Sequence, residues 1–190
     1  MSDPVLVLAS SSPRRKELLT WAGVAFEVSP GEVDESQQAG EIPVDYVRRL
    51  ALDKAIEAAG RHPGRYVLAA DTVVVLDDLI MGKPQSRNDA QNMLSRLSGK
   101  SHRVITSFCL IGPNGGKRIG HVETDVEFRQ LSAEDIERYI DSGEVWDKAG
   151  AYAIQARGAA LVNRVSGSFT NVIGLPLADV LEALSCNGLY

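Results

Sequence analysis

Short apolar runs alternate along this chain with segments whose apolar residues recur at helical spacing. The runs Val5–Leu8 and Tyr66–Ala70 are long enough for buried strands and too short for helices. Between them, Pro43–Ala59 carries apolar side chains at helical intervals, and Gly60 follows as a stop signal. The pattern therefore predicts a helix between two buried strands in the first part of the chain.

The same criteria predict the remaining elements, most of them bounded by glycine, proline or aspartate. Further strands are expected at Phe26–Val28, Val73–Leu76, Leu79–Gly82, Val104–Ile111, Gly120–Phe128 and Ala160–Val165. Further helices are expected over Pro13–Leu19, Ser86–Leu97 and Ser132–Ile140 and from Pro176 onward, with a loop at Gly167–Asn171. Because no repeat, low-complexity tract or linker interrupts the pattern, residues 1–190 are expected to form a single domain.

Charge and cysteine usage narrow the class of protein. The net charge of −5 argues against a nucleic-acid-binding surface, but it allows a local basic pocket for a nucleotide. Cys109 and Cys186 show no paired spacing, which is typical of reduced thiols in a cytoplasmic protein. The N-terminal segment has no long apolar stretch or cleavage-like site, so neither a signal peptide nor a membrane span is expected.

Hydroxyl and guanidinium groups gather directly after the first predicted strand. Ser10–Ser12 form a polar loop, Pro13 suits the first helical position, and Arg14 and Arg15 occupy the first turn. Free amides, hydroxyls, the positive end of the helix dipole and two guanidinium groups would converge there, as in a polyphosphate site. The alternative is an ordinary capped surface helix with two solvated arginines.

Asp71 stands with Thr72 between two apolar runs, at what the pattern predicts is the carboxyl end of a buried strand. A carboxylate is costly to bury unless it is paired, and α/β proteins place their sites at such strand ends. A catalytic or metal-binding role is therefore favoured for Asp71. The following hairpin brings Lys83 close, either as a surface ion-pair partner or as a cation that neutralises a phosphate.

Two further charged groups have open interpretations. Lys54 points along the apolar face of its predicted helix, either because it snorkels from the edge or because it reaches a phosphate. Glu32, Asp34 and Glu35 form an acidic loop that is either solvated or returns one carboxylate to the site as a metal ligand or proton acceptor.

The segment from Asp147 to Gly158 is rich in small residues, which let the backbone approach another strand or a ligand closely. Within it, the amide of Gln155 offers a donor and an acceptor in one plane, which suits the edge of a nucleobase. Complete phosphate-loop, zinc-protease and nucleophile-elbow motifs are missing from the sequence. An enzyme of this sequence would therefore rely on carboxylates, lysines, arginines and a divalent metal.

These residues carry a family resemblance. The blocks that match, in order, are LASSSPRRKELL, VDE, LDKA, AADTVVVLDD, GKP, DKAGAYAIQ and GSFTNVIGLPL. Together they resemble the Maf family of nucleoside triphosphate pyrophosphatases over nearly the whole chain. The resemblance implies an α/β fold related to the inosine-triphosphate pyrophosphatases. It consists of a long mixed β-sheet flanked by helices, with the active-site cleft between two lobes.

The resemblance also implies roles for individual residues. Asp71 corresponds to the general base or metal-linked acid, and Glu35, Lys54 and Lys83 match the other polar catalytic positions. Ser10 and Arg15 fall in the phosphate-binding segment. Mg²⁺ or Mn²⁺ would be held by Asp71 and Glu35, and the family pattern further implies a homodimer and cleavage of a nucleoside triphosphate to the monophosphate and pyrophosphate.

Three positions indicate the subgroup. Arg14, Thr72 and Gln155 resemble the dTTP/UTP-cleaving branch, whereas the 7-methyl-GTP branch tends to have Trp, Gln and Glu there. Val145-Trp146 departs from the pattern, since the family often has a proline before the DKAG block. Three alternatives stay open: a nucleotide-binding regulator of cell division or septum formation, an inosine or xanthosine triphosphate pyrophosphatase, and a protein-interaction scaffold.

Overall fold

The computed structural model describes residues 6–190, so Val5, where the first strand was expected to begin, lies outside the described residues. Within the described part, seven strands form one mixed sheet in the order β2-β1-β3-β5-β6-β7, and β4 pairs with β3. The strands are β1 (Leu6–Leu8), β2 (Phe26–Val28), β3 (Tyr66–Leu76), β4 (Leu79–Met81), β5 (Ser101–Ile111), β6 (Lys117–Phe128) and β7 (Val162–Ser166). β1 pairs in parallel with β2 and β3, and the other pairs are antiparallel.

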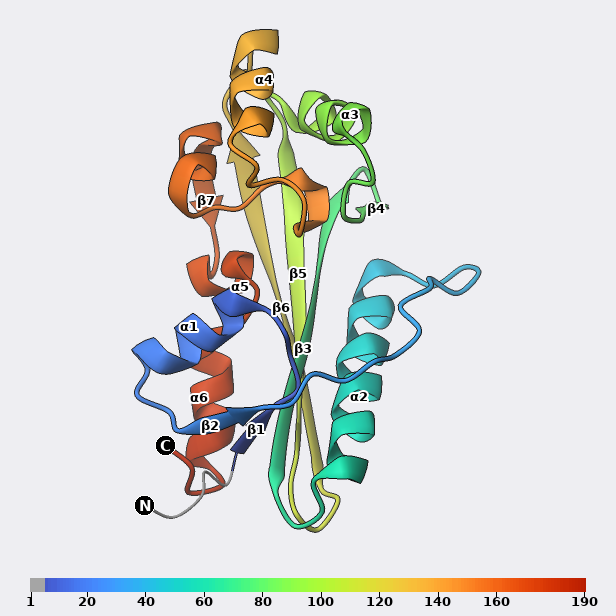
Figure 1. Cartoon of the computed structure of the whole chain (residues 1–190), viewed down its shortest axis with the longest axis vertical. Coiled ribbons are helices and arrows are strands. Elements are labelled where there is room, and N and C mark those ends of the chain that lie inside the picture. Colours follow the sequence, from blue (N-terminus) through green and yellow to red (C-terminus); the bar gives the residue numbers. More distant parts are fainter. Residues whose placement is uncertain (1–5) are drawn as a thin grey trace.

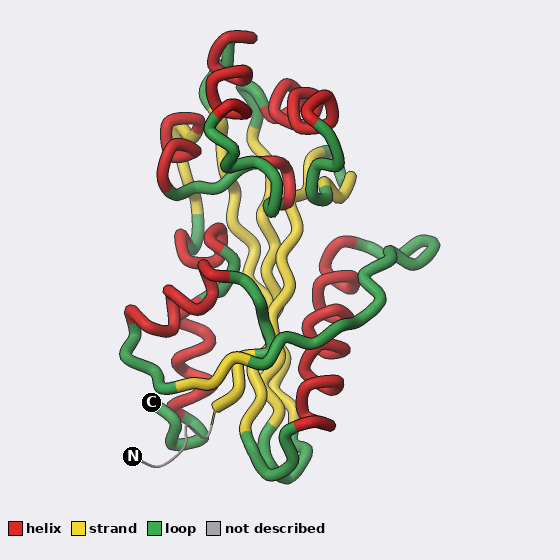
Figure 2. The backbone as a smooth tube through the Cα atoms, viewed as in Figure 1, coloured by secondary structure: helices red, strands yellow, loops and turns green. Residues whose placement is uncertain are grey.

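Helices flank this sheet in two groups. They are α1 (Pro13–Trp21), α2 (Pro43–Arg61), α3 (Arg87–Leu97), α4 (Ala133–Asp141), α5 (Phe169–Ile173) and α6 (Leu177–Ser185), with 3₁₀ turns η1 (Ala149–Ala151) and η2 (Ala156–Leu161). Figure 1 shows α3, α4 and the 3₁₀ turns around one end of the long strands, and α1, α2 and α6 around the other. The long strands β3, β5 and β6 run through both groups, which form two lobes on one sheet (Figure 2).

The core follows the two-residue period of the strands. On one face, Val67 and Ala69 pack with Ala51 and Ala55 of α2. On the other face, Leu68 and the neighbouring alternate positions of β3 pack in the cluster that includes α1 and α6. A separate apolar cluster fills the lobe formed by α3 and α4. This arrangement confirms the predicted mixed sheet flanked by helices.

The central strand differs from the sequence-based expectation. β3 runs without interruption from Tyr66 to Leu76, so Asp71 lies in the middle of a strand and not at its carboxyl end. The backbone of Asp71 pairs in register with Ser107 of β5, and its charge is compensated by Lys54, so the strand can continue through it.

The end of α2 also differs, because the helix continues through Gly60 to Arg61. Arg61 donates hydrogen bonds to Ser29 and to the carbonyl oxygen of Pro30, which ties this last turn to the loop after β2. The left-handed residue that reverses the chain is Gly64, with φ 78°. A glycine inside a helix is therefore tolerated here, since tertiary contacts hold the turn that contains it.

The C-terminal third holds two further corrections. The segment predicted as a strand from Ala160 starts as the 3₁₀ turn η2, and pairing with β6 begins only at Val162. The segment predicted as a loop at Gly167–Asn171 contains the start of α5, because the Ser168 hydroxyl accepts the Asn171 N–H as an N-cap. Such short elements have too few residues to show a period in the sequence.

The described helices include none that is long and apolar enough to cross a membrane.

Candidate active site

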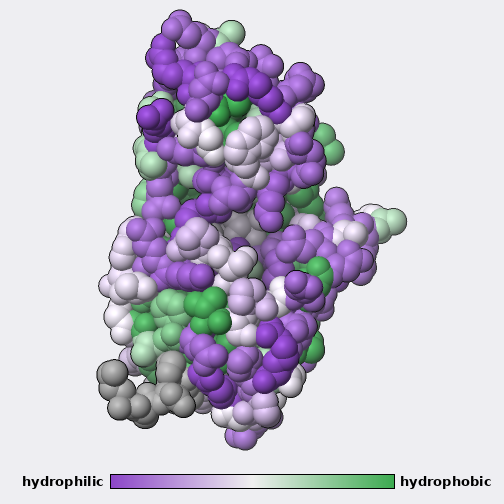
Figure 3. Space-filling view, in the orientation of Figure 1, coloured by the Kyte–Doolittle hydropathy of each residue, from purple (hydrophilic) through white to green (hydrophobic). Residues whose placement is uncertain are grey.

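A cleft of about 650 Å³ opens between the two lobes. The space-filling view in Figure 3 is hollowed at mid-height, with hydrophilic residues around the hollow. The structure brings every predicted site residue to the lining of this one cleft: Ser10, Arg14, Arg15, Glu35, Lys54, Asp71, Thr72, Lys83 and Gln155. Segments that lie far apart in the sequence therefore share one cavity.

The N-terminus of α1 forms part of the cleft wall. Ser12 is the N-cap and Pro13 the first helical residue, as predicted, but the Ser12 side chain makes no capping hydrogen bond. Instead the Ser10 hydroxyl accepts the Ser12 N–H at 3.2 Å, so the loop folds back on its own backbone. This turn places Ser10 beside Arg15, whose Nη1 donates to the Ser10 hydroxyl at 3.2 Å.

Arg15 is half-buried and is held by neutral oxygens. Its Nε donates to the Gly174 carbonyl oxygen at 2.7 Å, and its Nη2 donates to the Thr72 hydroxyl at 3.1 Å. Within residues 6–190 its hydrogen bonds go to these two oxygens and to the Ser10 hydroxyl. Desolvation lowers the pKa of Arg15, and the charge of Asp71 opposes this effect. A guanidinium that is fixed but not neutralised by a bonded carboxylate is suited to bind an anion.

Lys54 joins two carboxylates across the cleft floor. Its Nζ lies 2.7 Å from Asp71 Oδ1 and 2.6 Å from Glu35 Oε1. The side chains of Lys54 and Asp71 are each 12% exposed, whereas that of Glu35 is 50% exposed. Of the two interpretations of Lys54, the geometry excludes simple snorkelling to solvent, because the ammonium group is directed inward to two acids.

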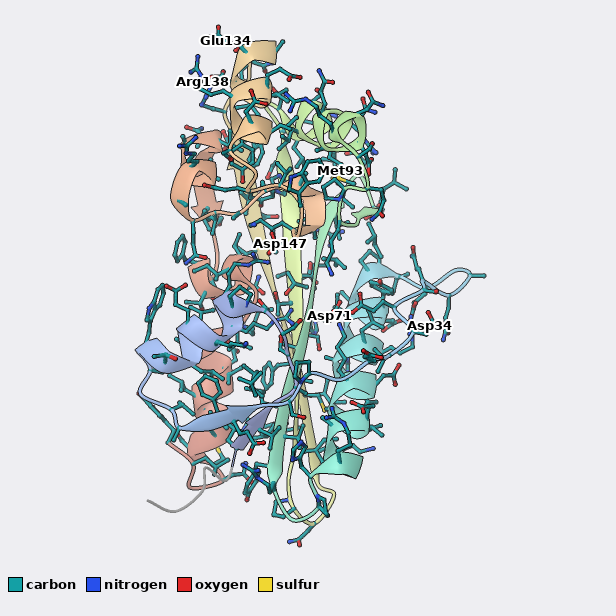
Figure 4. All side chains as sticks on the ribbon, viewed as in Figure 1. Asp34, Asp71, Met93, Glu134, Arg138 and Asp147 are labelled. Atoms are coloured by element: carbon teal, nitrogen blue, oxygen red, sulfur yellow. The ribbon has the colours of Figure 1, made fainter. Side chains whose placement is uncertain are left out.

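Glu35 is the member of the acidic loop that returns to the cleft. Burial raises the pKa of Glu35, but the hydrogen bond and charge of Lys54, with the charges of Lys83 and Arg15, hold it below its ordinary value. The Tyr46 hydroxyl donates to the Glu35 carbonyl oxygen at 2.7 Å, which anchors this part of the loop to α2. Figure 4 shows Asp34 on the loop outside the cleft, and Glu32 is likewise outside its lining.

The second lobe supplies the facing wall. Lys83 follows β4 and is exposed at the cleft, where its positive charge acts on Glu35. Asp147 lies above Asp71 in Figure 4 and accepts a hydrogen bond from Arg14 Nη1 at 3.0 Å, which joins the two lobes across the cleft mouth. Lys148 contacts the same carboxylate. Burial raises the pKa of Asp147, but Lys148 and Arg14 hold it below its ordinary value.

Gln155 and Thr72, two of the three positions that indicate the subgroup, have different environments. Gln155 lines the cleft at the start of η2, and within the described chain its side-chain amide has no hydrogen-bond partner, so it is free to meet a ligand. The Thr72 hydroxyl is already engaged, since it accepts from Arg15 and lies 2.9 Å from the Thr106 hydroxyl. In this structure Thr72 thus contacts Arg15 directly.

Sequence reasoning singled out the segment around Asp147 but missed Tyr46 and Gly174. The Gly174 carbonyl oxygen accepts a hydrogen bond from Arg15, and a backbone contact of this kind cannot be predicted from the type of side chain. Tyr46 lies on the cleft-facing side of α2 two turns before Lys54, a spacing that could have pointed to it.

The acids of the cleft set the possibilities for a metal ion. Glu35 and Asp71 both reach the Lys54 ammonium, so their oxygens converge on one region. Among residues 6–190 no group of three or more His, Cys, Asp and Glu side chains is arranged to hold a metal ion. Two carboxylates completed by phosphate oxygens and water are a donor set that suits Mg²⁺.

The fold of this chain resembles that of a solved protein structure. The HAM1 protein from Coxiella burnetii superposes with a TM-score of 0.55 at 19% identity, over 95% of this chain and 98% of that one. The family model for Maf-like proteins matches residues 5–186. The chain therefore belongs to the Maf-like protein family, which confirms the resemblance seen in its motifs.

Relatives with high sequence identity share this family. A protein from Geobacter sp. (strain M21), named dTTP/UTP pyrophosphatase, is 47% identical over 189 residues, which cover 99% of this chain and 98% of the relative. A protein of the same name from Myxococcus xanthus is 49% identical over 97% of this chain and 93% of its own length.

Proposed function

We propose that this protein hydrolyses nucleoside triphosphates, dTTP and UTP above others, to the nucleoside monophosphate and pyrophosphate. One observation carries the proposal: Arg15 and Asp71 line the same cleft. Arg15 is held in place by the Gly174 carbonyl oxygen, and Asp71 lies at hydrogen-bond distance from Lys54. The names of the two relatives support the choice of dTTP and UTP.

Binding follows from the distribution of charge. The chain is acidic overall, yet Arg14, Arg15, Lys54 and Lys83 all line the cleft. Phosphate oxygens would bind Arg15 and the hydroxyl of Ser10, and Lys83 would approach from the second lobe. Because Asp147 occupies Arg14, a phosphate that binds Arg14 has to compete with this carboxylate.

The reaction is a displacement at the α-phosphorus. A water molecule attacks this atom, the new P–O bond forms, and the bond to the bridging α–β oxygen breaks. Asp71 orients the water and accepts its proton, while the electron pair leaves with pyrophosphate. Arg15, Lys54 and Lys83 stabilise the negative charge that develops on the phosphate oxygens, and positioning and charge stabilisation supply most of the acceleration.

We propose Mg²⁺ or Mn²⁺ as the cofactor, with Glu35 and Asp71 as the residues that would hold it. The low pKa of Glu35 favours this role, since an ionised carboxylate is the form that ligates a cation. When bound, such an ion supplies positive charge at the phosphate oxygens. Lys54, which contacts both acids, would keep them close together before the ion and the substrate arrive.

The proposed activity is tested by pyrophosphate release. The protein is incubated with dTTP, UTP, CTP, GTP, ITP and XTP, each with Mg²⁺, with Mn²⁺ and with EDTA. We expect metal-dependent release that is greatest with dTTP and UTP. Preference for ITP and XTP would favour the inosine-triphosphate alternative. Binding without release would favour a nucleotide-sensing regulator of division, and neither binding nor release would favour a scaffold.

Two further features complete the proposal. We expect the protein to act in the cytoplasm, where its substrates occur and where Cys109 and Cys186, free thiols in the structure, would stay reduced. We also expect a homodimer, without nucleic acid as a partner. Size-exclusion chromatography with light scattering tests the dimer, since a single protomer mass over the working concentration range would contradict it.

A further inference from the structure

Behind the cleft wall, a line of hydroxyl groups leads from Arg15 into the core. Thr72 of β3 and Thr106 of β5 are paired in register, and their hydroxyl oxygens lie 2.9 Å apart. Arg15 Nη2 donates to the Thr72 hydroxyl at 3.1 Å, and the Thr106 hydroxyl donates to the Asn171 carbonyl oxygen at 3.0 Å. Thr106 is fully buried and lies outside the cleft lining.

Proton count and distance together set the direction of this chain of hydrogen bonds. Each hydroxyl has one proton, and that of Thr106 is donated to the carbonyl of Asn171, which can only accept. The Thr106 oxygen, at 2.9 Å, is a closer acceptor for the Thr72 proton than the Gly174 carbonyl oxygen, at 3.5 Å. Thr72 therefore donates to Thr106, and its own oxygen accepts from Arg15. Hydrogen bonds that run in one direction polarise one another, so Thr72 becomes a stronger acceptor for the guanidinium group.

The far end of the chain is anchored in the sheet. The buried Asn171 amide donates to the Val104 carbonyl oxygen and to the Thr124 hydroxyl, each at 2.9 Å. Asn171 belongs to α5, and Gly174, the residue directly after α5, accepts the Nε–H of Arg15. The same short segment thus determines two of the contacts that orient Arg15.

We propose that Thr106 and Asn171 are positioning residues, which hold Arg15 through Thr72 in the orientation that binds the phosphates of the substrate. This inference rests on the proposed function for the identity of the ligand. It also gives Thr72 a second task. A residue at this position affects phosphate binding through the placement of Arg15, in addition to any contact that it makes with the base.

The test compares variants at Thr106. Thr106→Val keeps the branched shape and removes the hydroxyl, whereas Thr106→Ser keeps the hydroxyl. We expect Thr106→Val to raise the KM for dTTP and the Ki of inorganic pyrophosphate about tenfold, the effect of one lost hydrogen bond, with a smaller change in kcat. Thr106→Ser should stay within about twofold of the unmodified protein, because it can still donate to Asn171.

A matched control separates positioning from general loss of stability. Ser98 of the second lobe forms hydrogen bonds with the backbone of Leu131, and Ser98→Ala removes a hydroxyl without touching the cleft. We expect it to lower the melting temperature and to leave the Ki of pyrophosphate unchanged. Equal losses of pyrophosphate affinity in Ser98→Ala and Thr106→Val would overturn the inference.

Thr72→Val supplies a second test if Thr106→Val does not fold. Where both single variants fold, the double variant should bind pyrophosphate no more weakly than Thr72→Val alone, because both residues act in one chain of hydrogen bonds. If only Thr72→Val folds, it should weaken pyrophosphate binding about tenfold, and unchanged binding would overturn the inference.

Calorimetric titration with pyrophosphate measures binding without turnover. If the unmodified protein does not hydrolyse nucleoside triphosphates, the proposed function alone is refuted. If folded Thr106→Val binds pyrophosphate with full affinity, the positioning role alone is refuted.

Discussion

Asp71 and Thr72 are consecutive residues of β3, yet they bind cations on opposite faces of the sheet. Asp71 accepts a hydrogen bond from Lys54 of α2, and Thr72 accepts one from Arg15 of α1. Successive side chains of a strand point to opposite faces, so one strand serves two helices at this level. Lys54 and Arg15 are therefore bound by adjacent residues of one strand, Asp71 and Thr72.

The first prediction concerns Asp71. Asp71→Asn keeps the size of the side chain but cannot accept a proton, so we expect kcat with dTTP and metal to fall about 10²- to 10⁴-fold. Asp34→Asn, on the exposed loop outside the cleft, should leave turnover within about twofold, since such surface changes are usually small. Near-normal turnover of a folded Asp71→Asn protein would exclude Asp71 as the base.

The second prediction concerns the pH dependence of activity. Lys54 holds the pKa of Glu35 below its ordinary value, so Glu35 stays ionised into the acid range. In Lys54→Gln this stabilisation is lost and the pKa of Glu35 rises. We expect the acidic limb of kcat/KM against pH to move to higher pH, in addition to a lower maximal rate.

Lys83→Gln is the comparison for this shift. Lys83 acts on Glu35 through its charge alone, whereas Lys54 also donates a hydrogen bond, so the limb should move less in Lys83→Gln. An acidic limb that stays in place in Lys54→Gln would show that ionisation of Glu35 does not limit the reaction.

The sequence was sufficient for most of the fold because most elements are long enough to show a period. The apolar positions of Pro43–Ala59 do pack against the sheet as α2, and Val67 and Ala69 meet them there. The sequence pattern placed Asp71 at the end of a strand, because a charged residue between two apolar runs is typical of a strand boundary. The strand continues because Lys54, distant in the sequence, compensates that charge.

That the candidate site residues would line one cleft was also predictable, but the contacts among them were not. Residue types suited to phosphate and acid–base chemistry marked Arg15, Lys54 and Asp71 individually. That Lys54 joins Asp71 to Glu35, or that Arg15 is held by the Gly174 carbonyl, depends on how distant segments pack. Such tertiary contacts, like the hydroxyl chain through Thr106, have no signature in local spacing.

The third prediction concerns selectivity for the base. Gln155 can donate and accept, which matches a pyrimidine edge with both kinds of group, whereas a glutamate at this position only accepts. We expect Gln155→Glu to lower the ratio of kcat/KM for dTTP over that for GTP about tenfold or more. Gln85→Glu, which adds the same charge elsewhere on the cleft lining, should leave the ratio unchanged. An unchanged ratio in Gln155→Glu would exclude a base-reading role.

The last prediction concerns stability against pH and a buried histidine of the second lobe. His102 is 3% exposed, its Nε2 lies 2.7 Å from the Tyr152 hydroxyl, and its ring packs edge-on against Phe128. Burial lowers the pKa of His102 from 6.5 to about 4, so the folded protein keeps it neutral where the unfolded chain takes up a proton. The contribution of the neutral, buried His102 to the free energy of unfolding is complete well above pH 6.5 and is lost as the pH falls toward about 4.

This difference in pKa predicts a slope that urea unfolding can measure. Between pH 6.5 and pH 5, protonation of His102 in the unfolded chain should lower the free energy of unfolding by about 1.5 kcal/mol. His102→Gln removes the titrating group, so this variant, although less stable at neutral pH, should lose about 1.5 kcal/mol less over the same interval. Ser98→Ala, which removes no titratable group, is the control and should keep the slope of the unmodified protein. Parallel slopes for His102→Gln and the unmodified protein would show that His102 is protonated in the folded state. Its bond to Tyr152, which lines the cleft, would then have to survive that added charge.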